Sequence, residues 1–166
     1  MSIWKFTKST SVRGLILNAD ETHICLIRRE KRGQLYYVAP GGGLEKGEDP
    51  IVGLRREVQE ETGLTLEAGG IARLGTIEFD GTQQVYYSAR TQGQLIAPSG
   101  QEASLLWQKD NGLFHPEWIA FSALKDLPFV SPVVLKLLVA YPEQGWPHAE
   151  FHVREKERAT RKLKVS

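Results

Sequence analysis

The chain has 166 residues, with 21 basic and 20 acidic side chains and a formal net charge of +1. This length favours one domain with a sizeable core, and the balanced charge excludes strong overall attraction to nucleic acid or anionic lipid. The single cysteine, Cys25, excludes an intramolecular disulfide. No apolar run is long enough to span a membrane, and the start of the chain lacks a signal-peptide core. We therefore expect a cytoplasmic location.

Short runs of apolar and β-branched residues, separated by turn residues, predict a series of strands. Residues 1–10 also alternate and fit a lead-in or an edge strand, whereas glycine, proline and serine across 91–111 predict mostly loop. Asp80-Gly81 is a typical hairpin turn between two of the strands. The predicted strands cover residues 12–18, 23–29, 35–38, 64–66, 71–79, 83–91 and 117–121.

Residues 49–62 carry the pattern of an amphipathic helix. Asp49 is a residue type that caps helices, and Pro50 suits the first helical position. Apolar residues follow at i, i+3 and i+7 spacing, and Gly63 supplies the left-handed residue that ends many helices. We expect one helix here with a single buried stripe.

Two further helices are predicted nearer the end of the chain, a short one over 123–127 that Ser122 can cap and a longer one over 131–141. The order of strands, helix, strands and helix predicts mixed α/β layers around one core. We expect a single domain over residues 1–150. Residues 151–166 are rich in charge and are expected to form a tail, either helical or disordered.

The stretch before and within the helix of residues 49–62 combines glycines with carboxylates. Glu57, Glu60 and Glu61 share one helical face because they are three and four residues apart. Their mutual repulsion is tolerated either on a solvated acidic face or around a divalent cation, since hard cations prefer carboxylate oxygen. Geometry alone leaves both interpretations open. The glycines at 41–43 and 47, which permit close backbone approach, favour a functional loop.

The pattern G-x5-E-x7-R-E-V-x-E-E-x-G-L runs from Gly42 to Leu64, and P-G-G-G-L-E-K-G-E precedes and overlaps its first half. This stretch resembles the Nudix box, so the chain resembles the Nudix hydrolase family. The resemblance implies an α/β/α sandwich with a mixed β-sheet. It also implies hydrolysis of a nucleoside diphosphate linked to another moiety, with Mg²⁺ or Mn²⁺ as cofactor.

The resemblance assigns metal ligands at named positions. Glu57, Glu60 and Glu61 match the metal-binding glutamates of the family. The backbone carbonyl of Gly41 or Gly42 resembles an additional ligand. These five residues are therefore the predicted metal site.

Other positions of the box carry supporting roles in the family. Arg56 matches the arginine that orients a glutamate, and Glu48 matches its ion-pair partner. Gly63 matches the structural glycine at the end of the helix. The resemblance leaves the general base open between a box glutamate and a loop carboxylate, for which Glu102 is the candidate here.

A diphosphate substrate requires cations in addition to the metal. Arg28 and Arg29 point to opposite faces of their predicted strand, and we favour Arg28 for the cleft, with Arg13 as its companion. Tyr37 is a candidate for stacking on a base. These three residues form the predicted substrate site.

The box defines the reaction class and leaves the substrate open. Subfamily markers for ADP-ribose and dinucleoside polyphosphates are absent, which favours a (d)NTP or a modified nucleotide. The alternatives are an RNA 5′ end, which a basic tail over 154–164 would contact, ADP-ribose or a nucleotide sugar, and a non-catalytic nucleotide sensor. The family also allows a homodimer.

Overall fold

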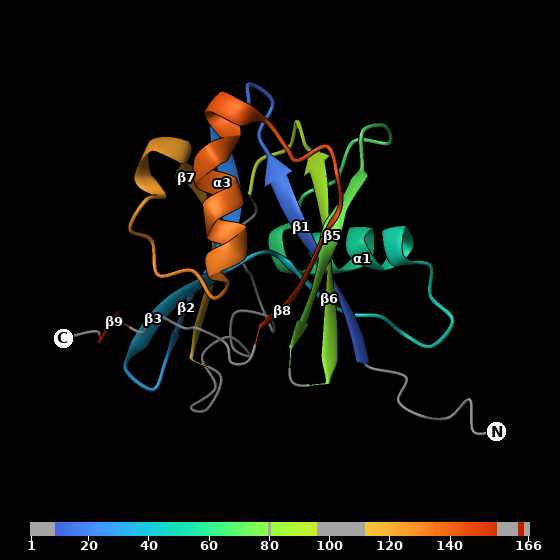
Figure 1. The fold of residues 1–166 in the computed structure, drawn as a ribbon, viewed down its shortest axis with the longest axis horizontal. Helices are drawn as coiled ribbons and strands as arrows, with labels where there is room; N and C mark the ends of the chain where they lie inside the picture. The colour runs from blue at the N-terminus through green and yellow to red at the C-terminus, as the bar shows by residue number, and fades with distance from the viewer. Residues whose placement is uncertain (1–8, 80, 96–111, 156–162, 165–166) are drawn as a thin grey trace.

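The computed structural model describes residues 9–79, 81–95, 112–155 and 163–164 (Figure 1). Their strands belong to a single sheet. The central path runs in the order β8-β5-β6-β1-β2-β3-β9, with β4 paired to β1 and β7 paired to β2. The strands are β1 (Ser9–Leu17), β2 (His23–Lys31), β3 (Gln34–Val38), β4 (Gly41–Gly43), β5 (Ala72–Phe79), β6 (Thr82–Arg90), β7 (Leu113–Ala120), β8 (Phe151–Glu155) and β9 (Leu163–Lys164).

The sheet is mixed, because β1 pairs parallel to β6 and β5 pairs parallel to β8, while the other pairs are antiparallel. Helices α1 (Pro50–Thr62) and α3 (Pro132–Gln144) lie on opposite faces of it (Figure 1). The predicted α/β/α arrangement with a mixed sheet is confirmed. In the described parts of the chain, neither helix has the length and apolar character needed to cross a bilayer.

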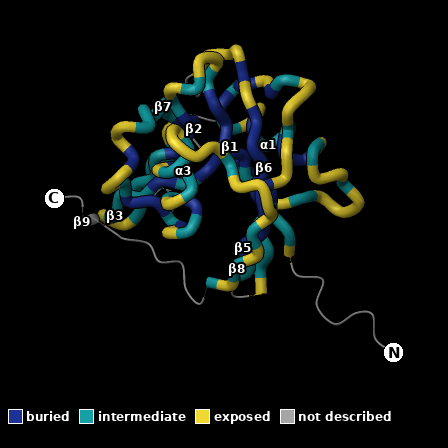
Figure 2. Tube along the Cα trace, turned by 45° about the horizontal axis from the view of Figure 1, so that its top comes forward, coloured by how far each residue is buried: buried dark blue, intermediate teal, exposed yellow. Residues whose placement is uncertain are grey.

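Strand β1 supplies side chains to the cores on both faces. Leu15 and Leu17 pack in the cluster that includes α3, whereas Val12 and Ile16 pack in the cluster that includes α1. This alternation follows from the two-residue period of a strand. The buried trace therefore runs through the middle of the sheet, with exposed residues at its margins (Figure 2).

Helix α1 forms as its sequence predicts. The Asp49 carboxylate accepts hydrogen bonds from the backbone N–H groups of Ile51 and Val52 at 2.9 and 3.2 Å. Gly63 ends the helix with φ of 73°, a conformation that glycine adopts without strain. Six of the seven predicted strands are present as β1, β2, β3, β5, β6 and β7, although β7 begins at Leu113 rather than at residue 117.

The strand predicted over residues 64–66 is wrong, because this segment is irregular. Side chains bind its backbone groups in place of a neighbouring strand. Arg55 donates to the carbonyl oxygens of Leu66 and Glu67 at 2.8 and 3.2 Å, and the Thr62 hydroxyl accepts from Leu64 N at 3.1 Å. Leu64 and Leu66 nevertheless lie buried in the α1-side core, which explains their strand-like apolar pattern.

The short helix predicted over 123–127 is also absent. A single 3₁₀ turn, η1 (Phe121–Ala123), follows β7 directly, and no side chain caps it. Phe121 N is bound to the Thr22 carbonyl at 3.2 Å, which ties the start of this turn to the sheet. The longer helix extends beyond residue 141 to Gln144, with Pro142 inside its last turn.

The expected charged tail contributes to the sheet. Residues Phe151–Glu155 form β8, which pairs parallel to β5 in a register that matches Gly75 with Phe151 and Phe79 with Glu155. The prediction of a helical or disordered tail is therefore wrong for this part. Residues 156–162 and most of the predicted lead-in strand and of the 91–111 loop, including Glu102, lie outside the described residues.

Gly75 provides a test of the β5–β8 pairing. Its φ is 159°, and an added Cβ would lie 2.3 Å from the Phe151 carbonyl oxygen. We expect Gly75→Ala to lower the free energy of unfolding by about 1–3 kcal/mol in urea titrations. The control is Gly69→Ala, because a Cβ at Gly69 meets no atom within 4 Å. Equal stability of the two variants would contradict the pairing.

Candidate metal centre

The site begins at the glycine strand β4, which pairs with β1 through Val12 opposite Gly42 and Arg13 opposite Gly41. Gly41 has φ of 148°, and a Cβ on it would lie 1.9 Å from the Val12 carbonyl oxygen. Any side chain at residue 41 would therefore clash with the backbone of β1. The glycines allow β4 to lie directly against β1 and beside α1.

Two glutamates of α1 contact this glycine strand. The carboxylate of Glu57 sits where a side chain at Gly42 would begin, since an added Cβ would lie 2.5–2.8 Å from its atoms. Glu61 Oε2 accepts a hydrogen bond from Gly41 N at 2.9 Å. Backbone groups of β4 and two carboxylates of α1 therefore meet at one place.

Arg56 connects three of the box carboxylates. Its Nε and one terminal nitrogen each donate to the Glu48 carboxylate at 2.9 Å, and the other terminal nitrogen donates to Glu57 at 2.9 Å. The Arg56 guanidinium holds the pKa of Glu48 down at about 2. Glu60 is more distant at 3.5 Å and its side chain is 56% exposed. The arginine therefore fixes Glu57 against the glycine strand and leaves Glu60 at the solvent edge.

Glu61 occupies a different environment from the other two glutamates of the face. Burial raises the pKa of Glu61 to about 7, although the hydrogen bond from Gly41 N and the positive charge of Arg13 oppose this shift. The nearby Glu57 charge adds to it. A buried carboxylate with this raised pKa is stabilised in its charged form by a cation placed beside it.

The residues present fit a hard divalent cation. The donors at the meeting point are carboxylate oxygens of Glu57 and Glu61 and backbone carbonyls of β4, the oxygen types that Mg²⁺ and Mn²⁺ prefer. Within the described ranges, no three acidic, histidine or cysteine side chains already converge at metal-binding spacing. Glu60 would have to turn from the solvent edge to complete the predicted set.

Arg13 supports the site from the opposite face of β1. One terminal nitrogen donates to the carbonyl oxygens of Ala39 and Gly41 at 3.1 and 3.3 Å. Arg13 therefore binds the carbonyl of the same residue whose N–H binds Glu61. The guanidinium also lines a recess on the α3 side of the sheet.

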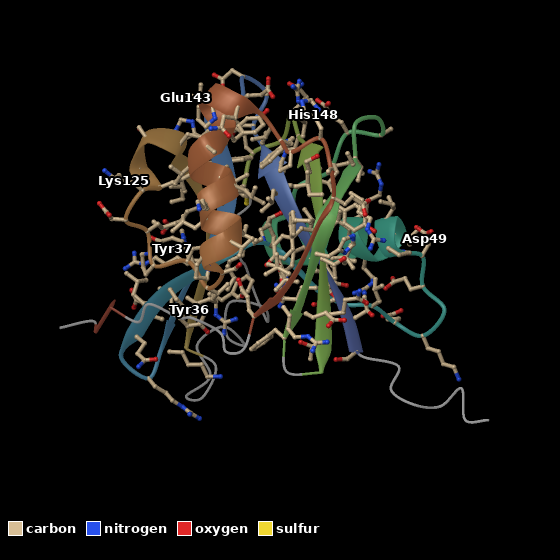
Figure 3. All side chains as sticks on the ribbon, in the orientation of Figure 1. Tyr36, Tyr37, Asp49, Lys125, Glu143 and His148 are labelled. Carbon is tan, nitrogen blue, oxygen red and sulfur yellow. The ribbon has the colours of Figure 1, made fainter. Side chains whose placement is uncertain are left out.

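The structure does not bring Arg28 or Tyr37 to the glutamates. The two residues pair across β2 and β3, and Arg28 forms ion pairs with Glu30 and Glu117 at 2.5 and 3.9 Å. Tyr37 is 8% exposed within the α3-side core, and desolvation followed by the Glu117 charge raises the pKa of its hydroxyl. It lies on the opposite side of the molecule from Asp49 at the start of α1 (Figure 3).

Arg29, and not the favoured Arg28, lies on the α1 side of β2 with the glutamates. It shares strand parity with Cys25, which packs in the α1-side core, and its charge lowers the pKa of Glu61. Its guanidinium lies 5.2 Å from the centre of the Phe114 ring. Counting by twos from Cys25 would have placed Arg29 on the α1 side.

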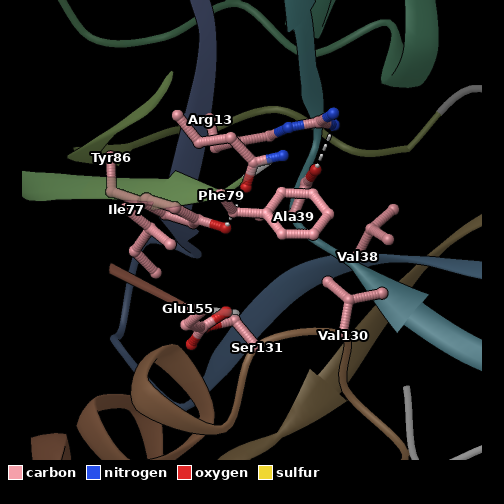
Figure 4. Close-up of a pocket in the computed structure, with 10 residues that line it drawn as sticks. Arg13, Val38, Ala39, Ile77, Phe79, Tyr86, Val130, Ser131 and Glu155 are labelled. Atoms are coloured by element: carbon pink, nitrogen blue, oxygen red, sulfur yellow. Dashed lines mark hydrogen bonds between the residues drawn. The ribbon is translucent and has the colours of Figure 1, made fainter. Parts of the chain in front are cut away.

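A recess opens on the α3 side of the sheet (Figure 4). Its cavity volume is about 40 Å³. Arg13, predicted to bind substrate, lines this recess, and its polar residues from β6, from the cap of α3 and from β8 had no predicted role. The lining residues are Arg13, Val38, Ala39, Ile77, Phe79, Gln84, Tyr86, Val130, Ser131 and Glu155.

A model of the NUDIX domain family matches residues 7–138. With this match and the glycine strand, arginine and glutamates in place, the chain belongs to the Nudix family. It is 29% identical over 99 residues to a MutT-like protein of Streptomyces ambofaciens, which covers 60% of this chain and 62% of that protein. The chain thus matches less than two thirds of that relative.

Solved structures share the fold. A MutT protein from Bacillus halodurans superposes with a TM-score of 0.61 at 19% identity, covering 93% of this chain and 94% of that one. An ADP-ribose pyrophosphatase from Streptococcus suis gives a TM-score of 0.56 at 16% identity, covering 90% of this chain and all of the other. A protein named as a mutator protein and one named for ADP-ribose therefore share this architecture.

The contact between Gly42 and Glu57 can be tested by adding one methyl group. Gly42→Ala would displace the Glu57 carboxylate, so we expect Mn²⁺ affinity to fall by about 10–100-fold, measured by electron paramagnetic resonance titration. Gly43→Ala is the matched control, because a Cβ there meets no atom within 4 Å. Equal Mn²⁺ affinity in both variants would contradict a metal site at this contact.

The buried Glu61 predicts a pH dependence of stability without metal. Its pKa rises from 4.5 to about 7 on folding, so the folded chain keeps a proton that the unfolded chain releases between these values. Stability should therefore fall as pH rises through this window, by up to about 3 kcal/mol. Urea titrations in EDTA from pH 4.5 to 8 measure it, and Glu61→Gln should lack this component. If the free energy of unfolding of Glu61→Gln depended on pH as it does in the wild-type chain, the raised pKa of Glu61 would not be the cause.

Proposed function

We propose that the chain is a divalent-metal-dependent pyrophosphohydrolase acting on a nucleoside triphosphate or a modified nucleotide. The observation that carries this proposal is the meeting of Glu57 and Glu61 with the β4 glycines. Carboxylates suit a divalent metal, and a divalent metal in turn suits the oxygens of a phosphate. The family membership supports the same chemistry.

Different residues of the chain have different proposed roles in hydrolysis. When bound, Mg²⁺ or Mn²⁺ supplies positive charge that stabilises developing charge on phosphoryl oxygens. Arg56 holds Glu57 in position, and the Gly41 N–H holds Glu61. Arg13 provides a fixed positive charge on the recess side. Catalysis by such a site depends on positioning and electrostatics more than on covalent chemistry.

The proton acceptor for the attacking water is proposed among the carboxylates. Glu61 is the candidate that the described residues support, since the Gly41 N–H holds its carboxylate beside the glycine strand at 2.9 Å. Glu102 is the second candidate from the sequence and lies outside the described residues. Separate Glu61→Gln and Glu102→Gln variants distinguish them by which one removes the acidic limb of the pH–rate profile.

A panel of substrates tests the proposed function. It contains the common NTPs and dNTPs, 8-oxo-dGTP, ADP-ribose, a nucleotide sugar, a dinucleoside polyphosphate and 5′-triphosphate RNA, each with Mg²⁺ and with Mn²⁺. We expect release of pyrophosphate and a nucleoside monophosphate from the triphosphates. A chain that binds Mn²⁺ yet hydrolyses none of these compounds would support the non-catalytic alternative instead.

Replacing the helix glutamates tests the assignment of the site. Glu57→Gln and Glu61→Gln keep the side-chain volume and remove the negative charge, so we expect kcat/KM to fall at least about 100-fold while the chain stays folded. Glu143→Gln is the matched control, because Glu143 is exposed on α3, away from α1 (Figure 3). Near-normal turnover in either helix variant would overturn the assignment.

A further inference from the structure

Arg13 binds the backbone of the segment that leads into the glycine strand. One terminal nitrogen donates to the carbonyl oxygens of Ala39 and Gly41 at 3.1 and 3.3 Å, and the contact with Ala39 is visible in Figure 4. The two carbonyls belong to the peptide units on either side of the unit that joins Pro40 to Gly41. Arg13 therefore holds both neighbours of the peptide unit that carries the Gly41 N–H.

The backbone groups of Gly41 lie outside the hydrogen-bond ladder between β1 and β4. Gly14 N donates to the Pro40 carbonyl at 2.8 Å. Bonded and non-bonded residue pairs alternate along two antiparallel strands, so the next pair, Arg13 opposite Gly41, is a non-bonded one. The N–H and C=O of Gly41 therefore point away from β1 and bind side chains, Glu61 through the N–H and Arg13 through the C=O.

The glycine strand needs such contacts to keep one conformation. All three residues of β4 are glycine, and Gly41 has a φ of 148°, which side-chain-bearing residues rarely adopt. Glycine loses more conformational freedom on folding than any other residue. A guanidinium that binds two successive carbonyls on one side of the segment offsets part of this cost. The direction of the Gly41 N–H is thereby fixed before a metal or a substrate binds.

We propose that Arg13 is a positioning residue of the metal centre, which directs the Gly41 N–H toward Glu61 and so holds this glutamate beside Glu57. This proposal rests on the proposed function. The guanidinium lies on the α3 side of the sheet and acts on the α1 side through the backbone between them. Its role therefore differs from the direct substrate contact that the sequence predicts for Arg13.

The two roles of Arg13 predict different losses. A positioning residue acts on the metal centre before substrate binds, so its removal weakens metal binding and lowers kcat. A residue that binds the substrate directly leaves metal affinity unchanged in the substrate-free chain, and its removal raises KM. The measurements below separate these effects.

Hydrogen exchange of the Gly41 amide tests the positioning without metal or turnover. We expect Arg13→Met, measured by ¹⁵N NMR in EDTA, to exchange this amide at least about 10-fold faster than the wild-type chain. Arg13→Lys keeps a donor for the carbonyls and should restore part of the protection. The Leu135 amide, bound to the Ser131 carbonyl in α3, should exchange at the wild-type rate in both variants.

Arg73→Met is the matched control for removing an arginine from the sheet. Arg73 binds the Thr76 hydroxyl at 3.2 Å and Glu150 at 3.6 Å, and neither belongs to the metal centre. We expect this variant to leave the exchange of the Gly41 amide unchanged.

Metal affinity and kinetics provide the second measurement. We expect the Mn²⁺ affinity of Arg13→Met, from electron paramagnetic resonance titration without substrate, to fall about 10-fold. With the triphosphate that the substrate panel shows to be hydrolysed, kcat should fall by about 10–100-fold while KM stays within about twofold. Arg13→Lys should recover part of both losses.

The outcomes separate this proposal from the proposed function. Faster exchange at Gly41 with weaker Mn²⁺ binding would support the role of Arg13 even if no nucleotide were hydrolysed. Unchanged exchange and Mn²⁺ affinity with a raised KM would assign Arg13 to the substrate, and would overturn the proposal while leaving the proposed function standing. Equally faster exchange at Gly41 and Leu135, with a lower urea midpoint, would show a general loss of stability and would also overturn it.

Discussion

The close approach of β4 to α1 is the constraint on which the site depends. The backbone at residues 41 and 42 lies where any side chain would collide with Val12 or with the Glu57 carboxylate. Because nothing projects from these two residues, carboxylates from a helix and polar groups from a strand share one small space. This arrangement places carboxylates close enough to repel one another. The ion pair with Arg56 offsets the repulsion at Glu57, and a bound cation would offset it at Glu61.

Local patterns were sufficient to predict α1 and most of the sheet. Asp49, the apolar spacing of the helix and Gly63 act within a few residues of one another, so the sequence encodes them directly. Residues 64–66 were mispredicted because Arg55 captures carbonyls that a strand would otherwise use. The segment after residue 150 was mispredicted because its charged composition conceals β8, and only the exposed edge of β5 makes a strand of it.

Part of the candidate site was likewise predictable from local sequence, and part of it was not. The contacts of Glu57 and Glu61 with the glycines follow from one continuous motif, and strand parity could have placed Arg29 beside them. The recess could not have been assembled from the sequence, because its lining comes from segments that meet only through the sheet order. Glu155 is a clear case, since it stands beside Phe79 through a parallel pairing that no local pattern specifies.

The pairing of β8 with β5 also decides which strand forms this edge of the sheet. Without β8, β5 would be an edge strand with a row of unpaired backbone groups and a buried face that includes Leu74 and Ile77. Such an edge is a template for strand addition by another chain. The segment that carries a carboxylate to the recess is therefore also the edge strand on this side, a short one whose exposed side chains are His152 and Arg154. Short, charged strands are the kind of edge that disfavours strand addition.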